Sequence, residues 1–104
     1  MMEDLIKVQD TFLIAGRGLV LLPDLPVPTG AGFTSFRCTV QLEAPTGRVA
    51  EEDAVMQLEH LHLVGGGSRW HVVVTLPNAT KDQVPVGSIV RASAETVRTL
   101  RGRG

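Results

Sequence analysis

The sequence predicts an all-β fold, a small, closed, six-stranded β-barrel in which most neighbouring strands are antiparallel. Short apolar runs with a period of two recur along the 104 residues. Gly- and Pro-rich stretches separate these runs, and no segment carries a long apolar stripe at helical spacing. This combination is typical of barrels and sandwiches. We expect residues 1–94 to form this single domain and residues 95–104 to form a basic, frayed tail.

The first strand is predicted over residues 5–14, where alternation places Ile6, Val8, Phe12 and Ile14 on one face. Gly16 and Gly18 bracket Arg17 at the following turn, and glycine is the residue that such turns tolerate best. An apolar run over residues 19–22 then returns as the second strand. The stretch as a whole therefore predicts a β-hairpin.

Residues 23–32 contain three of the six prolines together with two glycines, so they are predicted to form a surface loop. The next strand covers residues 36–43, where apolar and polar side chains alternate cleanly. Cys38 lies on its apolar face and is interpreted as a core thiol, because burial among apolar neighbours makes a thiol unreactive.

Two further strands, over residues 54–64 and 69–76, are predicted to pair through a turn at residues 65–68. In the second of these strands Trp70, Val72, Val74 and Leu76 share the inward face. Residues 77–87 are expected to be a loop with at most one helical turn, and residues 88–92 form the last strand.

Two stretches give the chain a family resemblance. The sequence DTFLIAGRGLVLL resembles the entry strand and turn of the second domain of translational GTPases such as elongation factor Tu, and VVVTLPNATKDQVPVGSIV is similar to a later segment of that domain. The residues that fall on the two patterns are Asp10, Phe12, Ile14, Gly16, Arg17, Gly18, Val20, Val72, Val74, Leu76, Val84, Gly87, Ile89 and Val90. The agreement covers about the first and last thirds of the chain.

The resemblance implies a stand-alone barrel of this kind, with Gly16, Arg17, Gly18 and Gly87 as its turn motif. GTPase activity is excluded, because a P-loop needs a lysine after a glycine-rich loop. Lys7 and Lys81 are the two lysines, and neither follows such glycines. A phosphate cradle at Gly16 and Gly18 would also need a following helix, whereas a strand is predicted.

Charge and composition restrict the function classes. The net charge of −1 gives no general attraction to nucleic acid or to anionic membranes. Arg98, Arg101 and Arg103 near the end are either a polyanion contact or a solvated terminus. The single cysteine indicates a reducing, cytoplasmic setting. No apolar run approaches the roughly 20 residues that span a bilayer, so no membrane partner is expected.

Three histidines form the sharpest candidate site. If the turn at residues 65–68 is tight, His62 pairs with His71, and His60 lies on the same face two residues away. Such a trio could hold a divalent metal with an open position for water, as catalytic zinc sites do. The alternative is a solvent-facing surface without metal, because Trp70 and Val72 are expected to face inward.

No catalytic residue is identified, and the leading hypothesis is a non-catalytic interaction module without a cofactor. Its expected partner is a protein, with an RNA-containing assembly as the alternative. A small metal-dependent enzyme that uses His60, His62 and His71 is the second hypothesis. The third is a structural protein that self-associates through an exposed strand edge.

Overall fold

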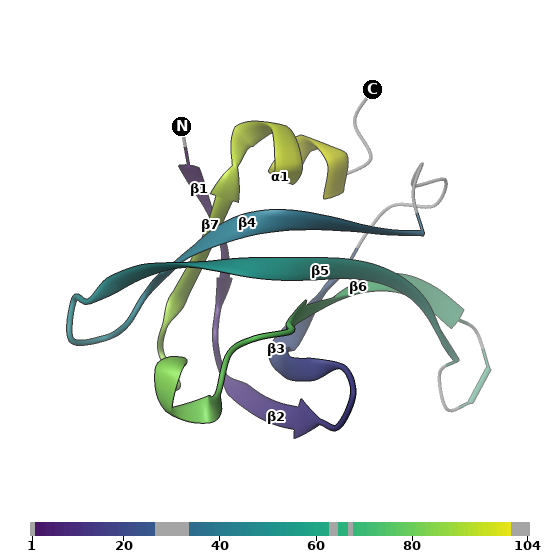
Figure 1. Cartoon of the computed structure of the whole chain (residues 1–104). Coiled ribbons are helices and arrows are strands. Elements are labelled where there is room, and N and C mark those ends of the chain that lie inside the picture. Colours follow the sequence, from purple (N-terminus) through teal and green to yellow (C-terminus); the bar gives the residue numbers. More distant parts are fainter. Residues whose placement is uncertain (1, 27–33, 63–64, 67, 101–104) are drawn as a thin grey trace.

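The described residues fold into one antiparallel sheet of seven strands, curled into a half-barrel (Figure 1). The computed structural model describes residues 2–26, 34–62, 65–66 and 68–100. The strand order is β1-β7-β4-β5-β6-β3-β2. The bounds are β1 Met2–Lys7, β2 Asp10–Ile14, β3 Gly18–Pro26, β4 Ser35–Glu43, β5 Val49–His62, β6 Ser68–Leu76 and β7 Ile89–Ser93, with a 3-10 turn η1 at Lys81–Gln83 and a helix α1 at Ala94–Leu100.

The all-β class is confirmed, but the expected closed barrel of six strands is not what forms. The predicted strand over residues 5–14 is broken at Val8 and Gln9 into β1 and β2, which are the two edges of the sheet. The Val8 amide donates to Ser88 O and the Gln9 amide to Leu22 O, both at 2.8 Å. The break thus carries the chain from one sheet edge to the other.

The break also reverses which side chains are buried. Ile6 and Val8 are buried, as predicted, but Phe12 is 42% exposed and Thr11 takes the buried position instead. A strict period of two cannot continue through an irregular pair of residues, so the predicted common face ends at Val8. Phe12 therefore belongs to the outer surface.

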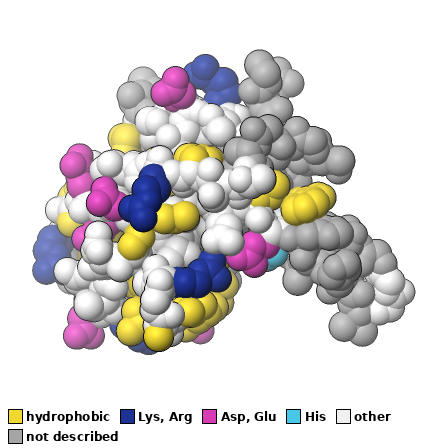
Figure 2. Space-filling view, turned by 45° about the vertical axis from the view of Figure 1, so that its right-hand side comes forward, with side chains coloured by type: hydrophobic (Ala, Val, Ile, Leu, Met, Phe, Trp, Pro, Cys, Tyr) yellow, Lys and Arg dark blue, Asp and Glu magenta, His cyan; other side chains and the backbone are white. Residues whose placement is uncertain are grey.

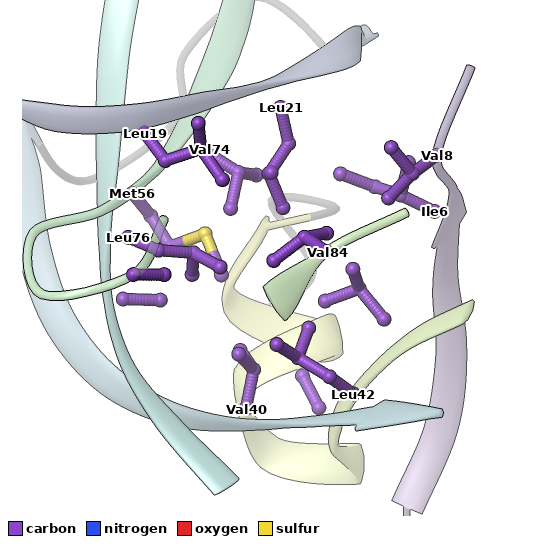
Figure 3. Packing of buried hydrophobic residues seen from close by; sticks show 14 of the residues in the cluster. Ile6, Val8, Leu19, Leu21, Val40, Leu42, Met56, Val74, Leu76 and Val84 are labelled. Atoms are coloured by element: carbon purple, nitrogen blue, oxygen red, sulfur yellow. The ribbon is translucent and has the colours of Figure 1, made fainter. Parts of the chain in front are cut away.

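The core lies inside the curl of the sheet (Figure 3). Buried hydrophobic side chains come from every strand except β2, whose buried residue is Thr11. The large side chains that are almost completely buried include Leu19, Leu21, Val40, Met56, Val72, Val74, Leu76, Val84 and Val90. Burying aliphatic side chains of this kind stabilises a domain by about 1.5–3 kcal/mol each before the entropy cost of ordering the chain. The sheet is consequently held by one continuous apolar cluster.

Strand β4 matches its prediction closely, whereas the hairpin of β5 and β6 has a different register. The observed pairs are His62 with Ser68, His60 with Trp70 and Glu59 with His71, not His62 with His71. This register places Leu58 opposite Val72 and Met56 opposite Val74 in the core. The expected tight turn would have put Glu59 inward, which burial of a carboxylate disfavours.

Two other segments also depart from the sequence prediction. Strand β3 continues through the first part of the predicted loop, as far as Pro26. Residues 94–100 form α1 rather than a frayed tail, and two of its own side chains, Val97 and Leu100, are buried. Ser93, the residue before α1, caps the N-terminus of the helix, since its Oγ accepts a hydrogen bond from the Thr96 amide at 3.1 Å. The helix packs on β1 and β7.

Polar contacts secure both edges of the sheet. On the β1 side, Arg91 bonds Glu43 Oε1 at 2.6 Å and Asp4 Oδ1 at 2.7 Å, and these bonds raise the pKa of the guanidinium. On the β2 side, the Thr11 amide donates to Asp10 Oδ1 at 2.8 Å, and Lys81 Nζ donates to the Thr11 carbonyl. Both main-chain groups of Thr11 are thereby satisfied by side chains.

Within residues 2–26, 34–62, 65–66 and 68–100, no helix is both long and apolar enough to cross a lipid bilayer.

The packing of α1 predicts that Leu100→Ala lowers the free energy of unfolding by about 2 kcal/mol or more, since a buried leucine is truncated. Arg98→Ala, on the exposed side of the same helix, is the matched control and should change it by less than about 0.5 kcal/mol. Urea denaturation followed by circular dichroism measures both. Equal, negligible effects would mean that the segment does not pack.

Candidate functional site

A groove of about 350 Å³ lies on the outer face of the sheet, over β2, β3 and β6. Its floor is apolar because outward positions in these strands carry hydrophobic side chains instead of the usual polar ones. The apolar lining is Phe12, Ile14, Val20, Leu22 and Val73. Figure 2 shows a face of the molecule on which apolar, basic, acidic and histidine side chains lie together. An apolar patch with charged neighbours is typical of an interaction site.

Val20 and Phe12 show how the groove is built. They are directly paired across the β2–β3 hairpin and so share the outer face. Val20 is only 3% exposed, whereas Phe12 is 42% exposed. The floor is therefore packed like a core, while its wall presents apolar surface to solvent.

Arg17 starts at the turn between β2 and β3 and reaches over β6 to β5. Its Nη2 lies 2.7 Å from Gln57 Oε1 and 3.6 Å from Glu59 Oε2. Because β6 separates β3 from β5 in the sheet, the side chain must cross the groove to make these contacts. The side chains of Arg17 and Glu59 are 40% and 36% exposed.

The turn that carries Arg17 depends on two glycines with positive φ, Gly16 at 83° and Gly18 at 117°. A Cβ on Gly18 would lie 2.6 Å from both Leu76 O and Pro77 Cα, whereas a Cβ on Gly16 would meet nothing within 4 Å. Gly18 is thus required for the close approach of two backbone segments. Gly16 is required only for its torsion angle.

His71 and Asp24 lie at the other end of the groove. The pairing of β3 with β6 shifts between Leu21 and Leu25, and Asp24 falls within this irregularity. His71 Nδ1 is buried and contacts Asp24 Oδ2, although the geometry is that of an ion-pair contact rather than a straight hydrogen bond. Glu59 is directly opposite His71 on β5. Two carboxylates therefore flank this imidazole.

The charged rim has an acidic excess when His71 is neutral. Among the described residues of the groove lining, Arg17 contributes one positive charge, and Asp24 and Glu59 contribute two negative charges. A cation approaching the groove is therefore attracted more than an anion. The groove is therefore suited to bind a ligand in which an apolar group lies next to a positive charge.

The predicted histidine trio does not have the register on which it was based. His71 pairs with Glu59, and His60 pairs with Trp70. The side chains of His60 and His62 lie outside the described residues. Among the side chains that the structure does describe, no group of three His, Cys, Asp or Glu residues is arranged to hold a metal ion.

The remaining predicted residues are dispersed. Gly87 has a φ of 94°, and its amide donates to Val8 O at 2.8 Å, so it supports the break between β1 and β2. Arg98 is exposed on α1 and does not line the groove, and Arg101 and Arg103 lie outside the described residues. Burial raises the pKa of the Cys38 thiol, consistent with a side chain that packs against the core.

Asp24 and Glu59 are the two acidic residues of the described groove lining, and the sequence alone does not identify them as site residues. Asp24 falls in the predicted proline-rich loop, and a tight turn at residues 65–68 would place Glu59 on the inward face. Glu59 is nevertheless a signal in the sequence that could identify the correct register. Pairing His62 with His71 would bury this carboxylate, which is unfavourable.

Comparisons of this chain with protein-family models, with curated proteins and with solved structures found no match.

The turn geometry predicts unequal effects of two alanine substitutions. Gly16→Ala should lower the free energy of unfolding by about 1–2 kcal/mol, the cost of a left-handed alanine. Gly18→Ala should cost about 1–3 kcal/mol more, because its methyl group also collides with the backbone after β6. Urea denaturation of both variants measures the difference. Equal losses would show that the close approach at Gly18 is absent.

Proposed function

We propose that this protein is a non-catalytic interaction module that binds a protein partner through the groove on the outer face of β2, β3 and β6. The observation that carries the proposal is the apolar lining of the groove, in which an exposed Phe12 and a half-buried Val73 lie over a buried Val20. Removing such surface from water favours association by about 25 cal/mol per Å² of apolar area. An apolar side chain of a partner is the group that gains most from this site.

A protein partner is favoured over RNA by the charges around the groove. Nucleic-acid affinity comes largely from lysines and arginines that neutralise phosphates. Arg17 is the cation of the groove lining, and it already contacts Gln57 and Glu59. Asp24 and Glu59 would repel a phosphate.

Self-association through the β2 edge is less favoured than a groove-bound partner. An exposed edge strand recruits another strand through its free main-chain groups. The amide of Thr11 in β2 already donates to the Asp10 side chain, and the carbonyl of Thr11 already accepts from Lys81 of η1. An added strand would have to displace both side chains.

We also propose that the curled sheet is a variant of the second-domain barrel of translational GTPases. The hairpin with Gly16 and Gly18 at its turn, and the positive φ of Gly87, support this assignment. An experimentally determined structure tests it. Superposition should align β2, β3, β6 and β7 with the strands of that barrel that carry the two matched patterns, and a different strand order in the matched region would refute the assignment.

Photo-crosslinking tests the groove as the binding surface. A benzophenone amino acid is placed at Phe12 in the groove wall or at Val86, which is 62% exposed and outside the groove lining. In cells that normally contain the protein, we expect a discrete adduct from position 12 that protease removes and ribonuclease does not. The Val86 variant should give no such adduct.

Two outcomes would contradict the proposal. Adducts of equal intensity from positions 12 and 86 would mean that the groove is not the contact surface. An adduct from position 12 that ribonuclease removes would show that RNA is the partner.

A further inference from the structure

Arg17 already shows how a positively charged group fits the far wall of the groove. Arg17 lies in the β2–β3 turn, and its guanidinium contacts Gln57 Oε1 and Glu59 Oε2 on β5. We define these two acceptors as the cation seat. A carboxylate and an amide oxygen side by side suit a guanidinium or ammonium group.

The two contacts that hold Arg17 in the seat are weak enough to exchange, because both the hydrogen bond to Gln57 and the ion pair with Glu59 are exposed to solvent. Both members of the Arg17–Glu59 pair are more than a third exposed, and their charged atoms are 3.6 Å apart. Exposed ion pairs of this kind change an equilibrium by up to about fivefold. Holding a long arginine side chain in one conformation also costs rotamer entropy. A second cation could therefore replace Arg17 without disturbing the fold.

Arg17 also covers the site that it crosses. Its side chain spans from the turn before β3 to β5, above the outward-facing residues of β6, and it is part of the groove lining. A ligand that packs on Val20 and Val73 must share this space with the arginine stem. Release of Arg17 from the seat would expose more of the apolar floor.

Without Arg17, the charged rim is acidic. Glu59 and Asp24 lie on either side of His71, and the backbone pairing keeps Glu59 beside it. Replacement of Arg17 by a cation from a partner restores the charge balance, whereas a carboxylate from a partner would face both acids. Charge complementarity thus selects a basic residue next to the apolar one.

We propose that the groove binds a peptide segment in which an apolar residue lies next to an arginine or lysine, and that this basic residue displaces Arg17 from the cation seat. Arg17 then acts as an intramolecular competitor that covers the groove in the free protein. The inference rests on the proposed function and specifies the chemistry of the partner.

The decisive test is the sign of the effect of Arg17→Ala. The probe is N-acetyl-leucyl-arginine amide, titrated to millimolar concentration into the isotope-labelled protein and followed by the NMR shifts of Val20, Val73 and Glu59. Arg17→Ala should tighten binding by about threefold to fivefold, since it removes the competitor. Glu59→Gln should weaken binding by a similar factor.

Arg48→Ala is the matched control, because it removes the same charge from the turn before β5, outside the groove lining. It should leave the affinity within about twofold of the wild type, since exposed charges that far away are largely screened. Weaker binding by Arg17→Ala than by the wild type would overturn the proposal, because Arg17 would then be a ligand contact. Failure of the leucyl-arginine probe to shift the groove signals of Arg17→Ala would overturn it too.

A second probe separates this inference from the proposed function. N-acetyl-leucyl-glutamate amide offers the same apolar side chain with the opposite charge. If both probes bind equally and shift the signals of Val20 and Val73, the cation seat is refuted while the groove still binds apolar side chains. We expect the leucyl-arginine probe alone to show saturable shifts.

Discussion

The register between β5 and β6 is the constraint on which both the core and the groove depend. Leu58 opposite Val72 and Met56 opposite Val74 put two apolar pairs inside the curl of the sheet. The same register puts Glu59 opposite His71 on the outer face. A slip by one residue would exchange the two faces, burying a carboxylate and exposing leucine and methionine. The apolar pairs thus fix where the acidic rim of the groove lies.

The break at Val8 and Gln9 gives the second half of the site. Before the break, Ile6 and Val8 face the core, and after it the same phase would have buried Phe12. The irregular backbone instead turns Phe12 outward beside Val20, while the hydrogen bonds to Ser88 and Leu22 keep the main chain satisfied. The groove exists because a strand that reads as continuous in the sequence changes its buried face halfway.

Strands β4 and β6 could be predicted from the sequence because their alternation is regular and their ends carry turn residues. The helix α1 could not, since seven residues with two buried apolar side chains give too weak a periodicity to distinguish from a solvated tail. The groove was missed for a related reason. Asp24 lies in a proline-rich stretch that reads as a loop, and Glu59 lies in a strand whose face depends on a turn length that local sequence does not determine.

The most direct test of this account is the NMR measurement of short interproton distances between the backbones of β5 and β6. We predict backbone contacts between Glu59 and His71 and between Leu58 and Val72, the pairs that place the acidic rim beside the imidazole. Backbone contacts between His62 and His71 would contradict the account, because that register turns Glu59 inward and removes the cation seat.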